Sequence, residues 1–131
     1  MTEDFQPQIF EFFAQKLEAK LPGVKLSSVI TDQPPGFPCV QIEQDDLPTD
    51  YDNSGRIRFV NVRLRVRVYT TGNTKTSQAR KIQMCIDETA NSLNFTRQSH
   101  ITRGYLYQNS AYRTETTYRA RMTEDGVLTR T

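Results

Sequence analysis

Six arginines in this sequence have the type and spacing to do chemistry. They fall at alternate positions of two segments, RFVNVRLRVRVYTTG at 58–72 and SAYRTETTYRARM at 110–122. They are Arg63, Arg65, Arg67, Arg113, Arg119 and Arg121. Because side chains alternate between the two faces of a strand, each set projects from one face of its strand. Rows of guanidinium groups bind phosphate or carboxylate oxygens, so the expected partner is a nucleic acid or an acidic protein surface.

Five carboxylates lie close together in the segment EQDDLPTDYDNSG, which covers residues 43–55. They are Glu43, Asp45, Asp46, Asp50 and Asp52. The segment has few apolar residues and contains Pro48 and Gly55, a composition that predicts a mobile acidic loop. We expect this loop to dock on the arginines of a neighbouring copy of the chain.

Charge is distributed unevenly along the chain, although the net charge is only +2. Residues 1–52 hold ten acids and three bases, whereas residues 53–131 hold fourteen bases and five acids. Opposite charges can therefore meet within one chain or head to tail between copies.

Residues for catalysis or metal binding do not cluster in the sequence. His100 is the single histidine, and Cys39 and Cys85 are too far apart for a CxxC pair. Glycine-rich phosphate loops and nucleophile elbows are missing. We expect no enzymatic activity, no cofactor and no metal, with two buried thiols and a surface or half-buried His100. No apolar run approaches the roughly 20 residues that span a bilayer, and no secretory signal is evident.

Two helices and about five strands must position the arginines. Apolar residues recur at helical spacing in 5–21 and in 76–94, where Thr74 or Thr76 is expected to cap the second helix and Asn94 to end it. Strands are predicted near 24–31, 37–44, 58–71, 97–108 and 110–122. The order α-β-β-β-α-β-β predicts an α+β fold, with an antiparallel, possibly mixed, sheet and both helices on one face.

The segment 58–72 is the longest predicted strand. Its even positions from Val60 to Val68 are all branched apolar residues and belong on a core. The apolar side switches near Phe59, which predicts either a bulge there or a strand end that leaves the sheet. Part of so long a strand is expected to project. If the even positions of both arginine strands face the helices, the six arginines share the other face, where Glu115 alone offsets them. A solvated strand face with scattered charge is the simplest alternative.

Four segments together resemble the small tail-completion, or tail-terminator, proteins of long-tailed bacteriophages. They are FFAQKLEAKLPG, PPGFPCVQIEQ, RFVNVRLRVRVYTTGNTKTSQARKIQMCIDETANSL and YRTETTYRAR. The shared pattern is a helix ending at Pro-Gly, a strand pair, a long alternating strand ending at Tyr69, a helix with Ala79 and Ile82 in register, and a last strand alternating Tyr and Arg. The resemblance covers roughly residues 5–122.

The resemblance implies a structural protein, not an enzyme, that forms a ring of six copies on the last ring of the tail tube and stops its growth. Its implied partners are further copies of itself, the major tail tube protein and the head-side connector, with DNA only passing through the channel and no membrane. The expected location is the tail or neck of a virion assembled in the host cytoplasm. Residues 1–131 would form one such domain, with an exposed tail at 123–131.

Two alternatives stay open at this point. One is a neighbouring head–tail joining, or neck, protein of similar architecture. The other is a nucleic-acid-binding module that uses the arginine-rich sheet face. The arginines would line a channel or lie between subunits in the ring, and would contact phosphates in the module.

Overall fold

The computed structural model describes residues 5–30, 36–51, 57–106, 111–123 and 126–130. Two helices and six strands form in these residues. In chain order they are α1 (Phe5–Lys20), β1 (Lys25–Ser27), β2 (Cys39–Tyr51), β3 (Ile57–Thr71), α2 (Lys75–Ser92), β4 (Thr96–Leu106), β5 (Ala111–Thr123) and β6 (Leu128–Thr129).

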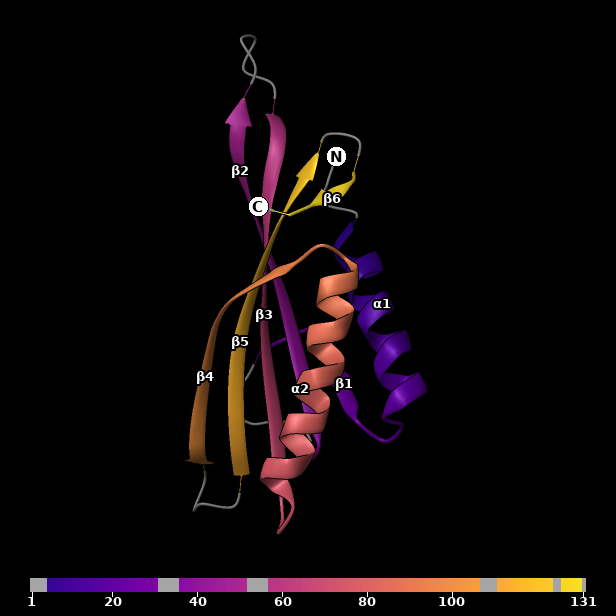
Figure 1. Cartoon of the computed structure of the whole chain (residues 1–131), viewed down its shortest axis with the longest axis vertical. Coiled ribbons are helices and arrows are strands. Elements are labelled where there is room, and N and C mark those ends of the chain that lie inside the picture. Colours follow the sequence, from indigo (N-terminus) through magenta and orange to yellow (C-terminus); the bar gives the residue numbers. More distant parts are fainter. Residues whose placement is uncertain (1–4, 31–35, 52–56, 107–110, 124–125, 131) are drawn as a thin grey trace.

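One mixed sheet carries the fold, and both helices cover the same face of it (Figure 1). The strand order is β1-β2-β3-β5-β4, and β6 pairs with the end of β5. Every pairing is antiparallel except that of β1 with β2, which is parallel. The predicted α+β class, the element order and the one-sided helix layer are confirmed, with six strands rather than about five because residues 128–129 add β6.

The hydrophobic core lies between the sheet and the helices. The side chains at the even positions of β3 form the centre of the core, as the alternation predicts. The apolar faces of α1 and α2 pack against them. Its members include Ile9, Phe13, Leu17, Val62, Leu64, Val66, Val68, Ile82, Ile86, Ala120 and Met122. Within the described residues, no helix is long and apolar enough to cross a membrane.

The two ends of α2 differ from each other. Thr74, one of the two predicted capping residues, occupies the N-cap position, but its hydroxyl makes no capping hydrogen bond. At the other end Asn94 has a φ of 68°, and the N–H groups of Asn94 and Phe95 donate to the carbonyls of Asn91 and Ala90. This pair of bonds satisfies the last helical carbonyls, and it confirms Asn94 as the residue that ends the helix.

The prediction of a mobile acidic loop at 43–55 is wrong over residues 43–51, where β2 continues and pairs with β3. Glu43 and Asp45 lie opposite Arg65 and Arg63, so these two charges, which disfavour an isolated strand, meet opposite charges across the ladder. Residues 52–56 lie outside the described part of the chain.

The register between β2 and β3 shifts at the level of Phe59, where the sequence predicts a bulge. Pro48 pairs with Val60, Asp50 with Phe59, and Tyr51 with Ile57, so one residue on each strand is left out of the ladder. Beyond this point the ends of β2 and β3 extend past the helices, which confirms that part of the long strand projects (Figure 1).

The C-terminal segment predicted as an exposed tail at 123–131 is partly docked. Thr123 belongs to β5, β6 pairs with β5, and Leu128 packs against the core. The Arg130 guanidinium donates to the carbonyls of Phe95 and Asn91 at 3.1 Å each. These contacts let the segment cover carbonyl groups at the end of α2.

The two edges of the sheet have different lengths. β1 forms one edge and has three residues. β4 forms the other edge, and its register with β5 shifts twice, between Arg97 and Ser99 and between Arg103 and Leu106.

Candidate functional site

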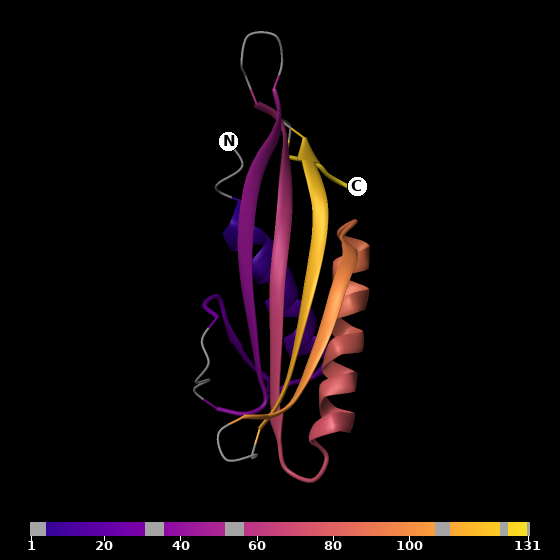
Figure 2. The same cartoon turned by 90° about the vertical axis from the view of Figure 1, so that its left-hand side faces the viewer.

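The six predicted arginines occupy odd positions of β3 and β5, on the sheet face opposite the buried even positions, and we call this face the arginine face. Figure 2 shows the strands of the sheet in front of the helices. The register between β3 and β5 brings the two rows together. Arg63 pairs with Arg119 across the two strands, Arg67 with Glu115, and Asn61 with Arg121. Alternation in the sequence therefore predicted this shared face.

Carboxylates of the same chain pair with the arginines of β3. Arg65 Nη1 lies 3.1 Å from Glu43 Oε1, and Arg63 contacts Asp45 through its Nη2. Arg67 Nε donates to Glu115 Oε1 at 2.8 Å, and Arg65 Nε lies 3.9 Å from the other oxygen of Glu115. Each of these three arginines thus has a counter-charge within its own chain.

The five acids predicted to dock on a neighbouring copy lie in different environments. Glu43 and Asp45 form the ion pairs within the chain. Asp46 pairs with Val62 and so faces the helix side, where Gln44 Nε2 donates to its two oxygens at 2.8 and 3.0 Å. Burial raises the pKa of the Asp46 carboxyl. Asp50 lies in β2 opposite Phe59, and Asp52 falls outside the described residues. Docking of these acids on another copy stays a prediction.

One end of the arginine face is buried. Tyr69 and Gln41 are fully buried on this face, Arg67 beside them is nearly so, and Arg113 is half-buried opposite Tyr69. Cys39 is buried there too, and burial raises the pKa of its thiol, which makes the thiolate a minor species. The six arginines therefore do not form one uniform surface.

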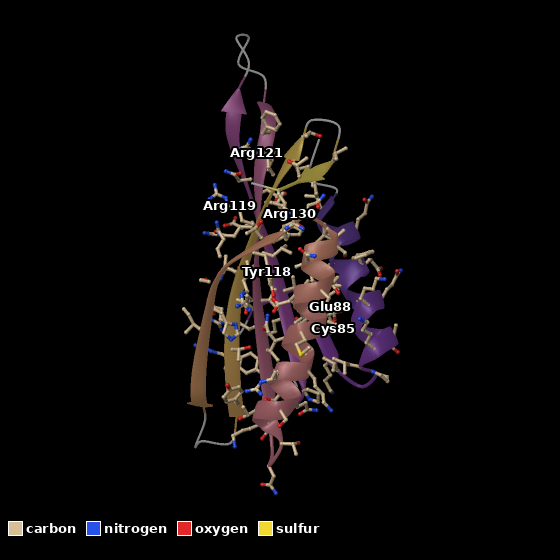
Figure 3. The ribbon with its side chains drawn as sticks, viewed as in Figure 1. Cys85, Glu88, Tyr118, Arg119, Arg121 and Arg130 are labelled. Atoms are coloured by element: carbon tan, nitrogen blue, oxygen red, sulfur yellow. The ribbon has the colours of Figure 1, made fainter. Side chains whose placement is uncertain are left out.

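The other end of the face carries charge that remains available. Arg119 lies directly opposite Arg63, and among the described residues no carboxylate lies within ion-pair distance of it. The Arg121 guanidinium lies over the Phe59 ring, 5.2 Å from its centroid. Both side chains point away from the helices (Figure 3). We call Arg63, Arg119 and Arg121 the arginine patch. Asp45 is its one acidic neighbour in the described ion pairs, so the patch has the chemistry to bind an anionic partner.

A second group of polar residues lies on the opposite face, in a cleft between α2 and the strands β4 and β5. We call it the polar cleft. Its volume is about 330 Å³. It is lined by Thr76, Ala79, Arg80, Gln83, Met84, Asp87, Arg97, His100, Tyr112 and Thr114.

A chain of hydrogen bonds connects three residues that line this cleft, Gln83, Asp87 and His100, with Thr116 and Tyr118 of β5. The Tyr118 hydroxyl donates to Asp87 Oδ1, and Gln83 Nε2 donates to that hydroxyl at 2.8 Å. Thr116 donates to Gln83 Oε1 at 3.2 Å, so its oxygen accepts from His100 Nδ1 at 2.8 Å.

Asp87 is the acceptor at the end of that chain. Its Oδ1 accepts hydrogen bonds from the Tyr118 hydroxyl and from Gln83 Nε2, and Arg97 Nη1 lies 3.3 Å from its Oδ2. Burial and the neighbouring Asp87 raise the pKa of Tyr118, whose phenol stays protonated. The network holds β5 to α2 through polar contacts in place of apolar ones.

The prediction of a surface or half-buried His100 is confirmed, because the residue is exposed. Its place in the network was not foreseen. One signal was present: Thr114, Thr116 and Tyr118 are polar residues at even, core-facing positions of β5.

Groups that could hold a metal do not gather in the described part of the chain: no three His, Cys, Asp or Glu side chains converge there. Burial also raises the pKa of the Cys85 thiol. The comparisons with known proteins add no relative: protein-family models were scanned and none matches the chain, and no curated protein matches it either.

Proposed function

We propose that this chain is a structural virion protein that forms a ring of six copies at the end of a phage tail tube. The ring ends tail growth and joins the tail to the head-side connector. Its partners are further copies of the chain, the major tail tube protein and the connector, and DNA passes through its channel.

The observation that carries the proposal is the order of elements together with the segments that occupy them. The segment FFAQKLEAKLPG forms the last turns of α1 and its end. The long arginine segment forms β3 and continues into α2, and YRTETTYRAR lies in β5 beside β3. These three segments of the resemblance thus occupy the elements expected for them, and β3 has 15 residues.

The charge of the arginine face supports a role in assembly. Arg65 and Arg67 are held by carboxylates of their own chain, so they stiffen the sheet. Arg119 and Arg121 have no such carboxylate in the described ion pairs, and like charge lies opposite Arg119. A surface of this kind gains free energy when an anionic partner covers it. In the ring, that partner is an acidic surface of the next copy or DNA in the channel.

Electron microscopy of the purified protein and native mass spectrometry test the ring. We expect six-fold rings, and we expect Arg119→Glu with Arg121→Glu to remove them while circular dichroism and the unfolding midpoint stay as in the parent. Lys81→Glu is the matched control, because Lys81 is an exposed base on α2, away from the arginine face. A strictly monomeric parent protein, both purified and in particles, would refute the ring.

A nucleic-acid-binding module is the second candidate, and the arginine patch is the observation that favours it. Fluorescence anisotropy with duplex DNA at several salt concentrations separates the two functions, since phosphate contacts give a steep loss of affinity with salt. The ring predicts weak binding at physiological salt. Tight binding with a steep salt slope that disappears in Arg119→Glu would favour the module. Labelling of particles at the tail–head junction distinguishes a terminator from a neck protein.

A further inference from the structure

One side of the sheet is open along much of β2. β1 pairs with residues 39–41 alone, so the rest of β2 has β3 as its sole partner among the described strands. The pairing with β3 runs without a register shift as far as Pro48. We call the outer side of residues 42–48 the open edge. Its backbone keeps the regular geometry of a strand, with one side occupied and the other without a described strand.

The backbone groups of alternate residues point to the open edge. Lys25 N donates to the carbonyl of Pro38 at 3.0 Å, so that carbonyl faces β1 and not β3. Successive residues of a strand direct their backbone groups to opposite sides, so Gln44 and Asp46 direct theirs to the same side as Pro38. Pro48 follows the same alternation, and proline is tolerated where its missing N–H faces away from the partner strand. The open edge therefore offers the N–H and C=O groups of Gln44 and Asp46.

The charge along the open edge is negative. β2 contains four carboxylates and no base. Glu43 and Asp45 pair with arginines of β3 on one face of the sheet. Asp46 lies on the helix face and has no basic partner among the described residues. Burial and the neighbouring Asp45 raise the pKa of Asp46, so its negative charge is poorly compensated.

Such an edge selects its partner by charge. Opposite side chains of adjacent strands interact, and like charges there repel, so a second copy of β2 is rejected. A strand with lysine or arginine residues is attracted instead. We propose that the open edge binds an extended, basic segment of a partner protein, which joins the sheet as a further strand beside β2. Its backbone pairs with Gln44 and Asp46, and one of its basic side chains lies beside the Asp46 carboxylate.

The chain has a basic strand of its own, β4, but that strand fits the open edge poorly. β4 contains Arg97 and Arg103 and no acid. Its ladder with β5 shifts twice, so it presents no regular run of backbone groups to another strand. A segment of another protein is therefore the occupant that we propose. This binding is independent of the proposed ring, because one chain and one segment suffice for it.

Amide hydrogen exchange followed by NMR tests the open edge. In the free protein we expect slow exchange at Glu43 and Asp45, whose N–H groups face β3, and fast exchange at Gln44 and Asp46. The probe is the peptide TKVKVKT, capped at both ends. It should slow exchange at Gln44 and Asp46 by about tenfold or more. It should also lower the pKa of Asp46, because a base then lies beside it.

Two control peptides separate strand addition from charge attraction. TEVEVET has the same pattern with the opposite charge and should not bind. TKVKVKT that is N-methylated at every lysine and valine keeps its charge but loses the backbone donors, and it should leave exchange unchanged. Asp46→Asn should weaken binding of TKVKVKT by about fivefold. Glu18→Gln is the matched control, because it removes an exposed acid of α1 outside the open edge, and it should change binding by less than about twofold.

Four results would overturn the proposal. They are slow exchange at Gln44 and Asp46 in the free protein, no effect of TKVKVKT on these amides, equal binding of either control peptide, and equal losses in Asp46→Asn and Glu18→Gln. Protection that appears without peptide as the protein concentration rises would assign the open edge to a second copy and so also overturn it. A monomer in native mass spectrometry whose Gln44 and Asp46 are protected by TKVKVKT refutes the proposed ring alone.

Discussion

The ion pair between Arg67 and Glu115 is predicted to be the strongest polar contact of the arginine face. Their side chains are 13% and 23% exposed, and Arg67 Nε donates to Glu115 Oε1 at 2.8 Å. The ion pair between Arg63 and Asp45 also joins a guanidinium to a carboxylate, but the two side chains are 44% and 48% exposed. The two pairs therefore differ mainly in their access to water.

The expected coupling follows from this difference. Two unit charges about 4 Å apart at an effective dielectric constant of about 20 attract by about 4 kcal/mol. Desolvation of the nearly buried pair offsets part of this, so we expect a coupling free energy of about 2 kcal/mol for Arg67 with Glu115. The exposed pair should couple by less than about 1 kcal/mol.

Double-mutant cycles in urea unfolding measure both couplings. The variants are Arg67→Met with Glu115→Gln, and Arg63→Met with Asp45→Asn. Arg65 also approaches Glu115 at 3.9 Å, so the first cycle is repeated in an Arg65→Met background. Glu115→Gln alone should lower the free energy of unfolding by about 3 kcal/mol, because the nearly buried Arg67 loses the carboxylate to which its Nε donates.

Equal couplings in the two cycles, or a larger one for the exposed pair, would refute the reasoning that burial decides which arginines are structural. If the prediction holds, a loss of assembly in Arg67 variants reports a weakened fold. Loss in Arg119 variants, which break no ion pair among the described residues, reports a lost partner contact.

Three further outcomes are expected. Tyr118→Phe should lower the free energy of unfolding by about 1–2 kcal/mol in urea, since Asp87 loses a buried donor, and an unchanged midpoint would contradict the network. Burial raises the folded-state pKa of Asp46 above its unfolded value, so stability falls as pH rises through that pKa. Asp46→Asn should therefore raise the melting temperature at pH 7 but not near pH 3, and a gain at both would exclude this cause. Asn94→Ala should cost about 1 kcal/mol in thermal unfolding and Asn94→Gly less, because φ is 68° there; the reverse order would contradict a left-handed requirement.

Alternation made β3 predictable from its own residues. Each even position from Val60 to Val68 is apolar and buried, so the segment carries a complete period-two pattern. The far half of β2 carries no such pattern. Its strand conformation depends on the arginines of β3 opposite Glu43 and Asp45, and this information lies in the partner strand.

The candidate sites were predictable to different degrees for the same reason. The shared face of the six arginines follows from period two alone. Which arginines are neutralised depends on the register of β2 against β3, and single-strand patterns do not encode a register. The polar cleft needs Gln83 and Asp87 of α2 to meet Thr116 and Tyr118 of β5, which only the packing of the helix on the sheet brings about.

The edges of the sheet limit how copies of the chain can join. An open strand edge adds further strands without end, and proteins suppress this with short, bulged or charged edges. β1 offers three residues, and β4 breaks its ladder twice and carries Arg97 and His100 as exposed side chains. Growth of a continuous sheet from copy to copy is therefore disfavoured along β1 and β4, whereas β2 beyond Gln41 pairs only with β3 among the described strands. Copies that join through side-chain surfaces instead meet at an angle set by those surfaces, and they close into a ring only where that angle allows it.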